Sequence, residues 1–241
     1  DFCLSRGLGD VYKRQGVVPI TFGADALGGA VNIVTRRSKR NYANLSYTFG
    51  SFNTHKSTLR IGQRLTDNIS LELNAYQNYS DNNYKVFTKY LDVHTGVFSK
   101  EPRWFTRFHD RYHNEALIGR LNIFNEKWAD KLSFGLNYNQ EYKQIQNANL
   151  MQIVFGGKYR TSHTYSSSME YEKKNIIRGL SFALTGRYDL TTTRNADEEP
   201  RQYAWDGTYR TKATKGEVQH ILQTFEGKTG YITSHIDYMP A

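Results

Sequence analysis

The residues with the clearest capacity for chemistry lie in the segment RFHDRYH at 107–113. His109 and His113 are four positions apart, a spacing that places two imidazoles on one face of a helix, where they could bind a metal ion. The surrounding sequence is polar and supplies no third ligand, so a solvated loop that contacts a small ligand is the simpler interpretation. We predict no metal site here. The candidate ligand-contact residues are Arg103, Trp104, His109, Asp110, Tyr112 and His113.

A second segment, TSHTYSSSMEYE at 161–172, brings Ser and His close together in sequence. A nucleophilic triad also needs an acid in an ordered geometry, and nothing in this segment indicates one. The segment is better explained as a polar strand. We therefore predict no catalytic residues and no cofactor, and the chain is not expected to be an enzyme.

A third segment, GVVPITFGADALGGAVNIVT at 16–35, admits three interpretations. A transmembrane helix is disfavoured by Pro19 and the glycines, and by Asp25, which would cost about 2.5–3.5 kcal/mol at mid-span. A nucleotide-binding loop is disfavoured because neither GxGxxG after a strand nor GK[ST] is present. The remaining interpretation is a strand, a tight glycine turn and a second strand, formed by VVPITF and AVNIVTR.

The composition is basic and aromatic, with a net charge of +9, 18 Tyr and 13 Phe. The cations are scattered apart from RRSKR at 36–40, and no nucleic-acid-binding motif accompanies them, so nucleic acid is not the expected partner. The single cysteine, Cys3, lies in a segment that we exclude below. The remaining chain therefore has neither a disulfide framework nor a cysteine-based metal site.

Residues 1–15, DFCLSRGLGDVYKRQ, are set apart from the fold argument. The codons GAT-GTG-TAT-AAG-AGA-CAG, which resemble the end of a transposon used to fragment DNA, translate as residues 10–15. We interpret this segment as a sequencing-adapter artefact fused to the reading frame. A natural N-terminal segment is the alternative.

Apolar and polar residues alternate along much of the chain after Arg40, and this period of two predicts strands. In the segment 131–139, for example, Leu132, Phe134 and Leu136 would share one face. We predict eight strands and no helix. The clearest alternation is at 44–49, 68–76, 131–139 and 180–188, and weaker alternation is at 56–64, 115–124, 164–172 and 229–238.

The second face of these strands is too charged to pack against another sheet. The strands are also long, at about nine to eleven residues, which is the length that a tilted strand needs to cross a bilayer. An apolar outer face and a polar inner face predict a transmembrane β-barrel. In a closed barrel every backbone N–H and C=O group within the membrane has a hydrogen-bond partner on a neighbouring strand. The charged residues of the second face are Arg60, Arg64, Glu72, Arg120, Glu170, Glu172 and Arg187.

The connections between the predicted strands alternate in length after a short first loop at 51–56. Short turns are expected at 65–68, 125–130 and 172–179, and long connections at about 80–113, 143–162 and 190–227. Outer-membrane barrels have short periplasmic turns and long extracellular loops. The alternation therefore favours the same architecture.

The stretch FGADALGGAVNIVTRR resembles the conserved end of the plug domain in TonB-dependent outer-membrane receptors, where G-x-[DA]-[AS]-x-G-G-x-[IV]-N-[IV] precedes the first barrel strand. Later stretches at 49–56, 75–86, 107–116 and 141–158 resemble Bacteroidetes-type members. The positions that fill the pattern are Gly23, Asp25, Ala26, Gly28, Gly29, Val31, Asn32 and Ile33.

The resemblance implies the end of a plug at 16–37 and the N-terminal part of a 22-stranded barrel at 41–241. It also implies active import of a scarce ligand, such as a siderophore or another metal chelate, driven by the TonB complex across the bacterial outer membrane. Because about fourteen strands, most of the plug and the TonB-binding box are not in this sequence, the strands are expected to form an open sheet with unpaired edges. A passive porin, an outer-membrane enzyme and a soluble glycan-binding module are the alternatives.

Overall fold

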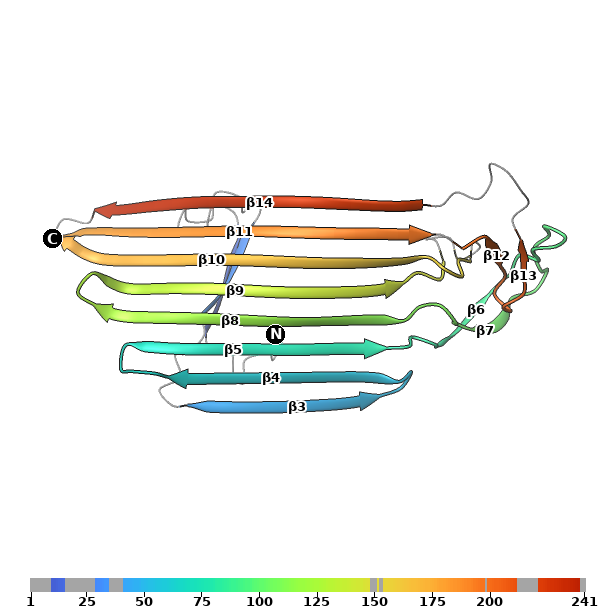
Figure 1. The fold of residues 1–241 in the computed structure, drawn as a ribbon, viewed down its shortest axis with the longest axis horizontal. Helices are drawn as coiled ribbons and strands as arrows, with labels where there is room; N and C mark the ends of the chain where they lie inside the picture. The colour runs from blue at the N-terminus through green and yellow to red at the C-terminus, as the bar shows by residue number, and fades with distance from the viewer. Residues whose placement is uncertain are drawn as a thin grey trace.

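The computed structural model describes residues 10–15, 29–34, 41–147, 151, 154–197, 199–211 and 221–238. All regular structure in these residues is β-strand, which confirms the prediction of an all-β chain. Within them, no helix is long and apolar enough to span a membrane. Figure 1 shows one broad sheet, with two pairs of short strands beyond one of its ends.

The large sheet is an antiparallel meander of eight strands, and each of the eight predicted regions falls on one of them. The strands contain 9 to 19 residues. The sheet is open, with β3 and β14 at its edges, as expected from the sequence. In order, its strands are β3 (Tyr42–Gly50), β4 (Thr54–Arg64), β5 (Ile69–Ser80), β8 (Tyr112–Glu126), β9 (Ala129–Gln144), β10 (Tyr159–Ile177), β11 (Leu180–Asp197) and β14 (Ile221–Tyr238).

Cross-strand pairing separates the side chains into two faces of opposite character. One row, which defines the apolar face, runs through Leu45, Leu59, Ala75, Leu117, Tyr138, Tyr165 and Leu190. Another row, which defines the polar face, runs through Gly62, Glu72, Arg120, Gly135, Ser168 and Arg187. All seven charged residues that the sequence assigned to the second face lie on the polar face. Each is a member of the polar row or lies an even number of residues from the member in its own strand, and side chains two residues apart point to the same face.

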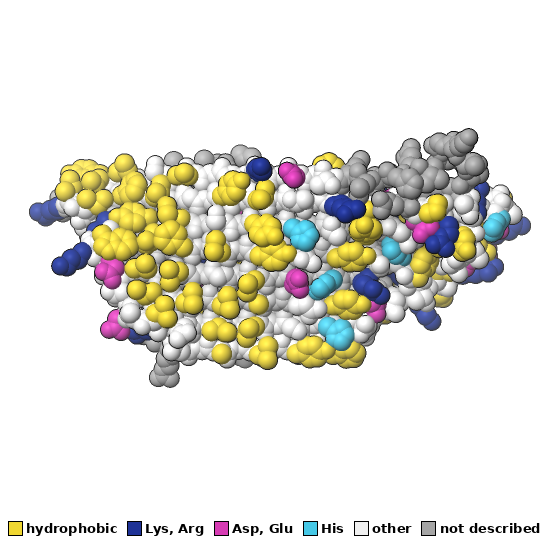
Figure 2. All heavy atoms as spheres, viewed as in Figure 1, with side chains coloured by type: hydrophobic (Ala, Val, Ile, Leu, Met, Phe, Trp, Pro, Cys, Tyr) yellow, Lys and Arg dark blue, Asp and Glu magenta, His cyan; other side chains and the backbone are white. Residues whose placement is uncertain are grey.

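The apolar side chains form a band that crosses the strands obliquely (Figure 2). On the apolar face, the exposed apolar residues of β3 are Leu45, Tyr47 and Phe49, whereas those of β14 are Ile232, Ile236 and Tyr238. Phe225 and Tyr231 of β14 are also exposed, on the polar face. The register aligns Leu45 with Lys228, so the band moves toward the end of β14 as the sheet is crossed. An offset of about eight residues at ~3.3 Å each, over seven strand spacings of ~4.8 Å, corresponds to a tilt of roughly 40°.

The sheet has no hydrophobic core of its own. The chain exposes 17182 Å², whereas a compact monomer of this mass would expose roughly 11,000 Å². Within the described residues, most of the fully buried hydrophobic side chains lie in or next to the long connections rather than between layers of the sheet. Within the part of the chain that the structure describes, nothing covers the apolar face.

The long connections all leave the same end of the sheet. They join β5 to β8, β9 to β10 and β11 to β14, whereas short turns join β4 to β5, β8 to β9 and β10 to β11 at the opposite end. The predicted alternation of long and short connections is confirmed. Asn125 and Gly179 adopt positive φ angles of 54° and 84° at two of the tight turns, a conformation that Asn and Gly accept readily.

The three long connections pack together into a unit that we call the loop cap, comprising the described residues of 81–111, 145–158 and 199–211. It contains two hairpins, β6 (Lys85–Thr88) with β7 (Arg103–Thr106) and β12 (Arg201–Tyr203) with β13 (Tyr209–Thr211). Its core is formed by Val86, Val154 and Trp205, against which Tyr90, Phe105 and Tyr203 pack.

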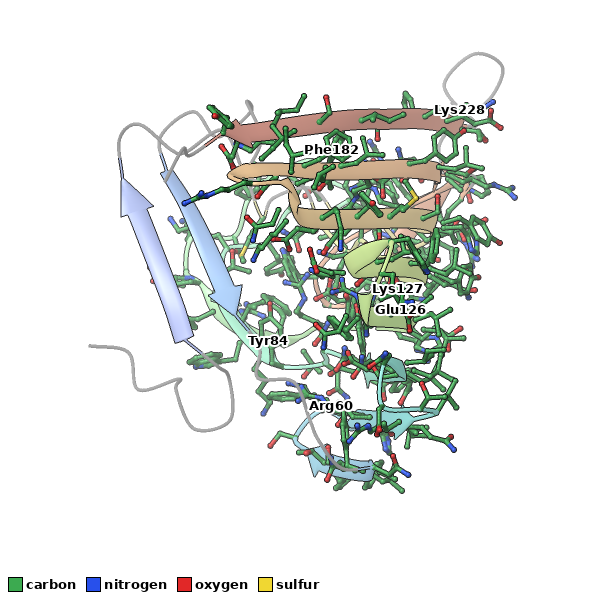
Figure 3. All side chains as sticks on the ribbon, turned by 90° about the vertical axis from the view of Figure 1, so that its left-hand side faces the viewer. Arg60, Tyr84, Glu126, Lys127, Phe182 and Lys228 are labelled. Atoms are coloured by element: carbon green, nitrogen blue, oxygen red, sulfur yellow. The ribbon has the colours of Figure 1, made fainter. Side chains whose placement is uncertain are left out.

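A separate two-stranded sheet precedes the large one. β1 (Asp10–Gln15) pairs with β2 (Gly29–Val34), and Figure 3 shows this hairpin on the side of the large sheet toward which Arg60, a polar-face residue, points. β1 lies in the segment interpreted as an artefact, and that interpretation stays a prediction. Of the plug-end residues, Gly29 and Asn32 lie in β2, whereas Gly23, Asp25, Ala26 and Gly28, like the strand predicted at 17–22, lie outside the described residues.

We predict that Trp205→Ala unfolds the loop cap without unfolding the sheet. Trp205 is 2% exposed, and its indole Nε1–H donates to the Met151 carbonyl at 2.6 Å. Its truncation should cost about 3–5 kcal/mol in the free energy of unfolding of the cap. The matched control is Trp104→Ala, because Trp104 is 66% exposed. Protease cleavage rates within 81–111 and 199–211 measure the effect, and equal rates in the two variants would contradict it.

Candidate functional site: the loop cap

The β6–β7 hairpin has one face in the cap core and one face in solvent. Val86 and Phe105 pair across the strands on the inner face. Phe87 and Trp104 pair on the outer face, where their rings lie 5.2 Å apart and both are exposed. Alternation along two short strands therefore fixes an aromatic pair on the surface of the cap.

Arg107 joins the first two long connections at the centre of the cap. Its Nη2 donates to Asn147 Oδ1 at 2.8 Å, and its Nε lies 3.1 Å from Asp110 Oδ2. The guanidinium also lies over the rings of Tyr84 and Trp205, with 5.1 and 6.0 Å to the centroids. Arg107 is only 7% exposed. Its charge is therefore compensated by partners inside the cap rather than by water.

Gln146 connects the same two loops through backbone groups. Its side chain is fully buried, and its Oε1 accepts hydrogen bonds from the amides of Phe108 and His109 at 2.9 and 3.3 Å. These contacts tie the residues before β8 to the residues after β9.

The third connection packs on the second through Tyr203 and Trp205. Val154 forms a backbone bridge with Tyr203, and Gly156 lies beneath the Tyr203 ring, where an added Cβ would come within 2.0 Å of a ring carbon. Only glycine fits at this position unless the ring moves.

His109 and Asp110, two of the predicted ligand contacts, take part in the packing of the cap. The Nε2 of His109 lies 3.0 Å from the Lys158 carbonyl, to which the neutral ring donates. Burial lowers the pKa of His109, and the Lys158 carbonyl opposes that shift. Burial raises the pKa of Asp110, and Arg107 opposes that shift. His109 therefore links the first long connection to the second, whereas Asp110 pairs with Arg107 within the first connection.

The other four predicted contacts lie on three different surfaces. Arg103 and Trp104 are exposed on β7, and the guanidinium of Arg103 lies 5.6 Å from the Tyr90 ring centroid. Tyr112 has the parity of the polar face, whereas His113 lies on the apolar face, opposite Tyr79. The structure thus separates His109 from His113, because the segment is a loop that enters a strand rather than a helix. Among the residues that the structure describes, no group of three or more His, Cys, Asp and Glu is arranged to hold a metal.

The serine-rich segment 161–172 lies within β10, and alternation places its groups on opposite faces. Ser162 pairs with Thr193 on the polar face through hydroxyls 3.1 Å apart. His163 projects from the apolar face, where its Nδ1 lies 3.3 Å from the hydroxyl of Tyr138. The segment is therefore a strand with one polar face, as the sequence indicated.

The sequence did not single out the residues that build the cap: Arg107, Gln146, Tyr203 and Trp205. Arg107 lies in the RFHDRYH segment, but its neighbours Thr106 and Phe108 do not mark it as the centre of the cap, because its partner Asn147 is 40 residues away. Gln146 and Trp205 carry no local signal, because their partners lie 37 to 54 residues away in sequence. Chemically, the cap offers exposed aromatic and cationic groups, which suit ligand binding.

No protein-family model matches this sequence. The resemblance to TonB-dependent receptors therefore depends on the quoted residues of the chain. The structure shows an all-β fold whose largest sheet is an open, antiparallel sheet of eight strands.

We predict that the loop cap becomes less stable as the pH falls from about 7 to about 5. The pKa of His109 is lowered in the folded cap, so the unfolded cap binds more protons below the ordinary histidine value of about 6.5 and stability is lost as the pH falls. The change is measured as the urea midpoint for exposure of Trp205, in a background with Trp104 and Trp128 replaced by Phe.

His109→Gln is the control, because glutamine can still donate to the Lys158 carbonyl but does not titrate. Its urea midpoint should change little over the same pH range. A cap that becomes more stable on acidification would contradict the prediction and would indicate that Asp110, whose pKa is raised, dominates instead.

Proposed function

We propose that this chain forms part of the wall of a TonB-dependent outer-membrane receptor, which imports a scarce ligand such as a metal chelate. In this proposal the apolar face contacts lipid, the polar face lines the lumen and the loop cap is extracellular. The TonB complex is the energy-coupling partner, and the chain itself needs no cofactor.

The observation that carries the proposal is the oblique course of the apolar band. In a soluble sheet that packs on a second layer, the apolar residues have no reason to shift from strand to strand. In a barrel whose strands tilt by about 35–45°, the hydrocarbon core of the bilayer surrounds a different stretch of residues in each successive strand. The offset from Leu45 in β3 to Ile232 and Ile236 in β14 supports that arrangement, because it corresponds to roughly 40°.

Aromatic residues at both margins of the band support the same orientation. Phe49, Tyr79 and Tyr142 lie toward the loop cap on the apolar face. At the opposite end Tyr171 donates its hydroxyl to the Trp128 carbonyl at 2.6 Å, and Trp128 is exposed. Aromatic girdles of this kind mark the two interfaces of a bilayer.

Import rather than passive diffusion is favoured by the resemblance of residues 23–33 to a plug end. β2, which carries part of that segment, lies on the polar side of the sheet, where the plug of such a receptor would sit (Figure 3). The exposed Trp104 and Arg103 of the cap offer contacts for an extracellular ligand. A passive porin is the second candidate, since the wall alone would serve either function.

Conductance distinguishes the two candidates. We expect the complete protein to remain closed in a planar lipid bilayer, because a plug fills the lumen. Deletion of the plug should open a large, steady conductance. An open channel without that deletion would support the porin and contradict import through a plugged receptor.

Two arginine substitutions test the membrane orientation itself. Leu136 and Thr185 are both exposed and lie near the middle of the band, but Leu136 is on the apolar face and Thr185 is on the polar face, opposite Glu170. Leu136→Arg should make folding into lipid vesicles less favourable by about 2–4 kcal/mol, because it buries a charge in the bilayer. Thr185→Arg should change it by less than about 1 kcal/mol. Equal effects would contradict the proposed orientation.

A further inference from the structure

A shallow hollow lies on the polar face of the sheet, near the middle of the strands. Its volume is about 180 Å³, which suits a small molecule rather than a drug-sized compound. Gly135 of β9 has no side chain, so the floor of the hollow lies at the backbone, between Arg120 of β8 and Ser168 of β10. Arg187 of β11 follows Ser168 in the same row. The hollow therefore has an arginine on each side.

Three side chains of this hollow carry hydrogen-bond donors that have no partner among the residues described. The guanidinium of Arg120 forms no hydrogen bond or ion pair with them, and the Ser168 hydroxyl forms no hydrogen bond. Arg187 uses its Nε and Nη2 to donate to Asp189 Oδ2 and Oδ1, at 2.8 and 3.0 Å, so its Nη1 is unused. Guanidinium and hydroxyl donors of this kind suit a carboxylate.

The charges around the hollow leave a positive excess. No Asp or Glu lines it. Of the three nearest carboxylates on the polar face, two are in ion pairs, and Glu72, which lies opposite Arg120 in the register, forms none. Four cations accompany them, so this region carries a net positive charge near pH 7. The cations are Arg60, Arg120, Lys131 and Arg187, and the carboxylates are Glu72, Glu170 and Asp189.

We propose that this hollow binds a small dicarboxylate, with one carboxylate on Arg120 and the other on Arg187 Nη1 and the Ser168 hydroxyl. The two arginines lie on opposite sides of Gly135, so a ligand with a carboxylate at each end meets a guanidinium at each end. A neutral ligand of the same shape would gain weaker hydrogen bonds. The inference rests on the proposed function, because the lumen of a receptor would bring a soluble ligand to this face.

The test compares succinate with succinamide, which has the same carbon skeleton and no charge. Binding to the complete protein is measured by equilibrium dialysis of the isotopically labelled compounds, in a neutral maltoside detergent at about pH 7 and about 0.15 M salt. We expect succinate to bind at least roughly tenfold more tightly than succinamide, because charge-assisted hydrogen bonds are stronger than neutral ones. Acetate, with a single carboxylate, should bind more weakly than succinate.

Three variants assign the binding to the hollow. Arg120→Gln should weaken succinate binding roughly tenfold. Gly135→Val should weaken it as much with every charge retained, because a Cβ at Gly135 would already lie 2.5 Å from Ser168 Oγ. The control is Arg60→Gln, which removes the same charge from the same face (Figure 3). Arg60 is three strands from Gly135, about 14 Å, so screening should keep its effect below about twofold.

Equal binding of succinate and succinamide, or equal losses in Arg120→Gln and Arg60→Gln, would overturn the inference. Binding by a plug-deleted protein but not by the complete protein would overturn the assignment to a soluble ligand, because the plug would then occupy the hollow. Folding of each variant into lipid vesicles is measured separately. A protein that folds into vesicles but does not prefer succinate contradicts this inference alone, whereas a protein that does not fold into them contradicts the proposed function.

Discussion

Backbone pairing in a single register is the constraint on which the rest of this structure depends. The eight strands pair without a shift, except for an irregularity between Lys173 and Ile177 at the short-turn end of β10. Because side chains alternate, a slip of one residue in any strand would move its apolar residues to the polar face. The uninterrupted register therefore creates two continuous surfaces from segments that are individually only alternating sequences.

The same register explains why the loop cap can form. In the antiparallel sheet, each long connection leaves one strand and enters the next at the same end of the sheet, so the three connections lie side by side. They join β5 to β8, β9 to β10 and β11 to β14. Arg107, Gln146 and Trp205 then link loops that are far apart in sequence. The cap has a small core of its own because the sheet below provides no apolar layer on which the loops could pack.

The sequence predicted the features that depend on local periodicity, and it did not predict those that depend on contacts between loops. Alternation located all eight strands, because it is imposed by the pleat itself. The spacing of His109 and His113 suggested a shared face only for a helix; the loop-to-strand transition instead directs one ring into the cap and the other onto the apolar face. Arg107 could not be recognised as the centre of the cap, since its partner Asn147 is 40 residues away.

The exposed apolar face connects the fold to its proposed environment. Soluble monomers seldom expose a continuous apolar patch of more than a few hundred Å², yet here large hydrophobic side chains are exposed on strands from β3 to β14. Exposure of that surface to water is unfavourable, and a second protein layer would favour a band that crosses the strands without an offset, whereas a bilayer crossed by tilted strands favours an oblique band. Such a bilayer would end between the apolar band and the loop cap, where the aromatic side chains of Phe49, Tyr79 and Tyr142 lie on the apolar face.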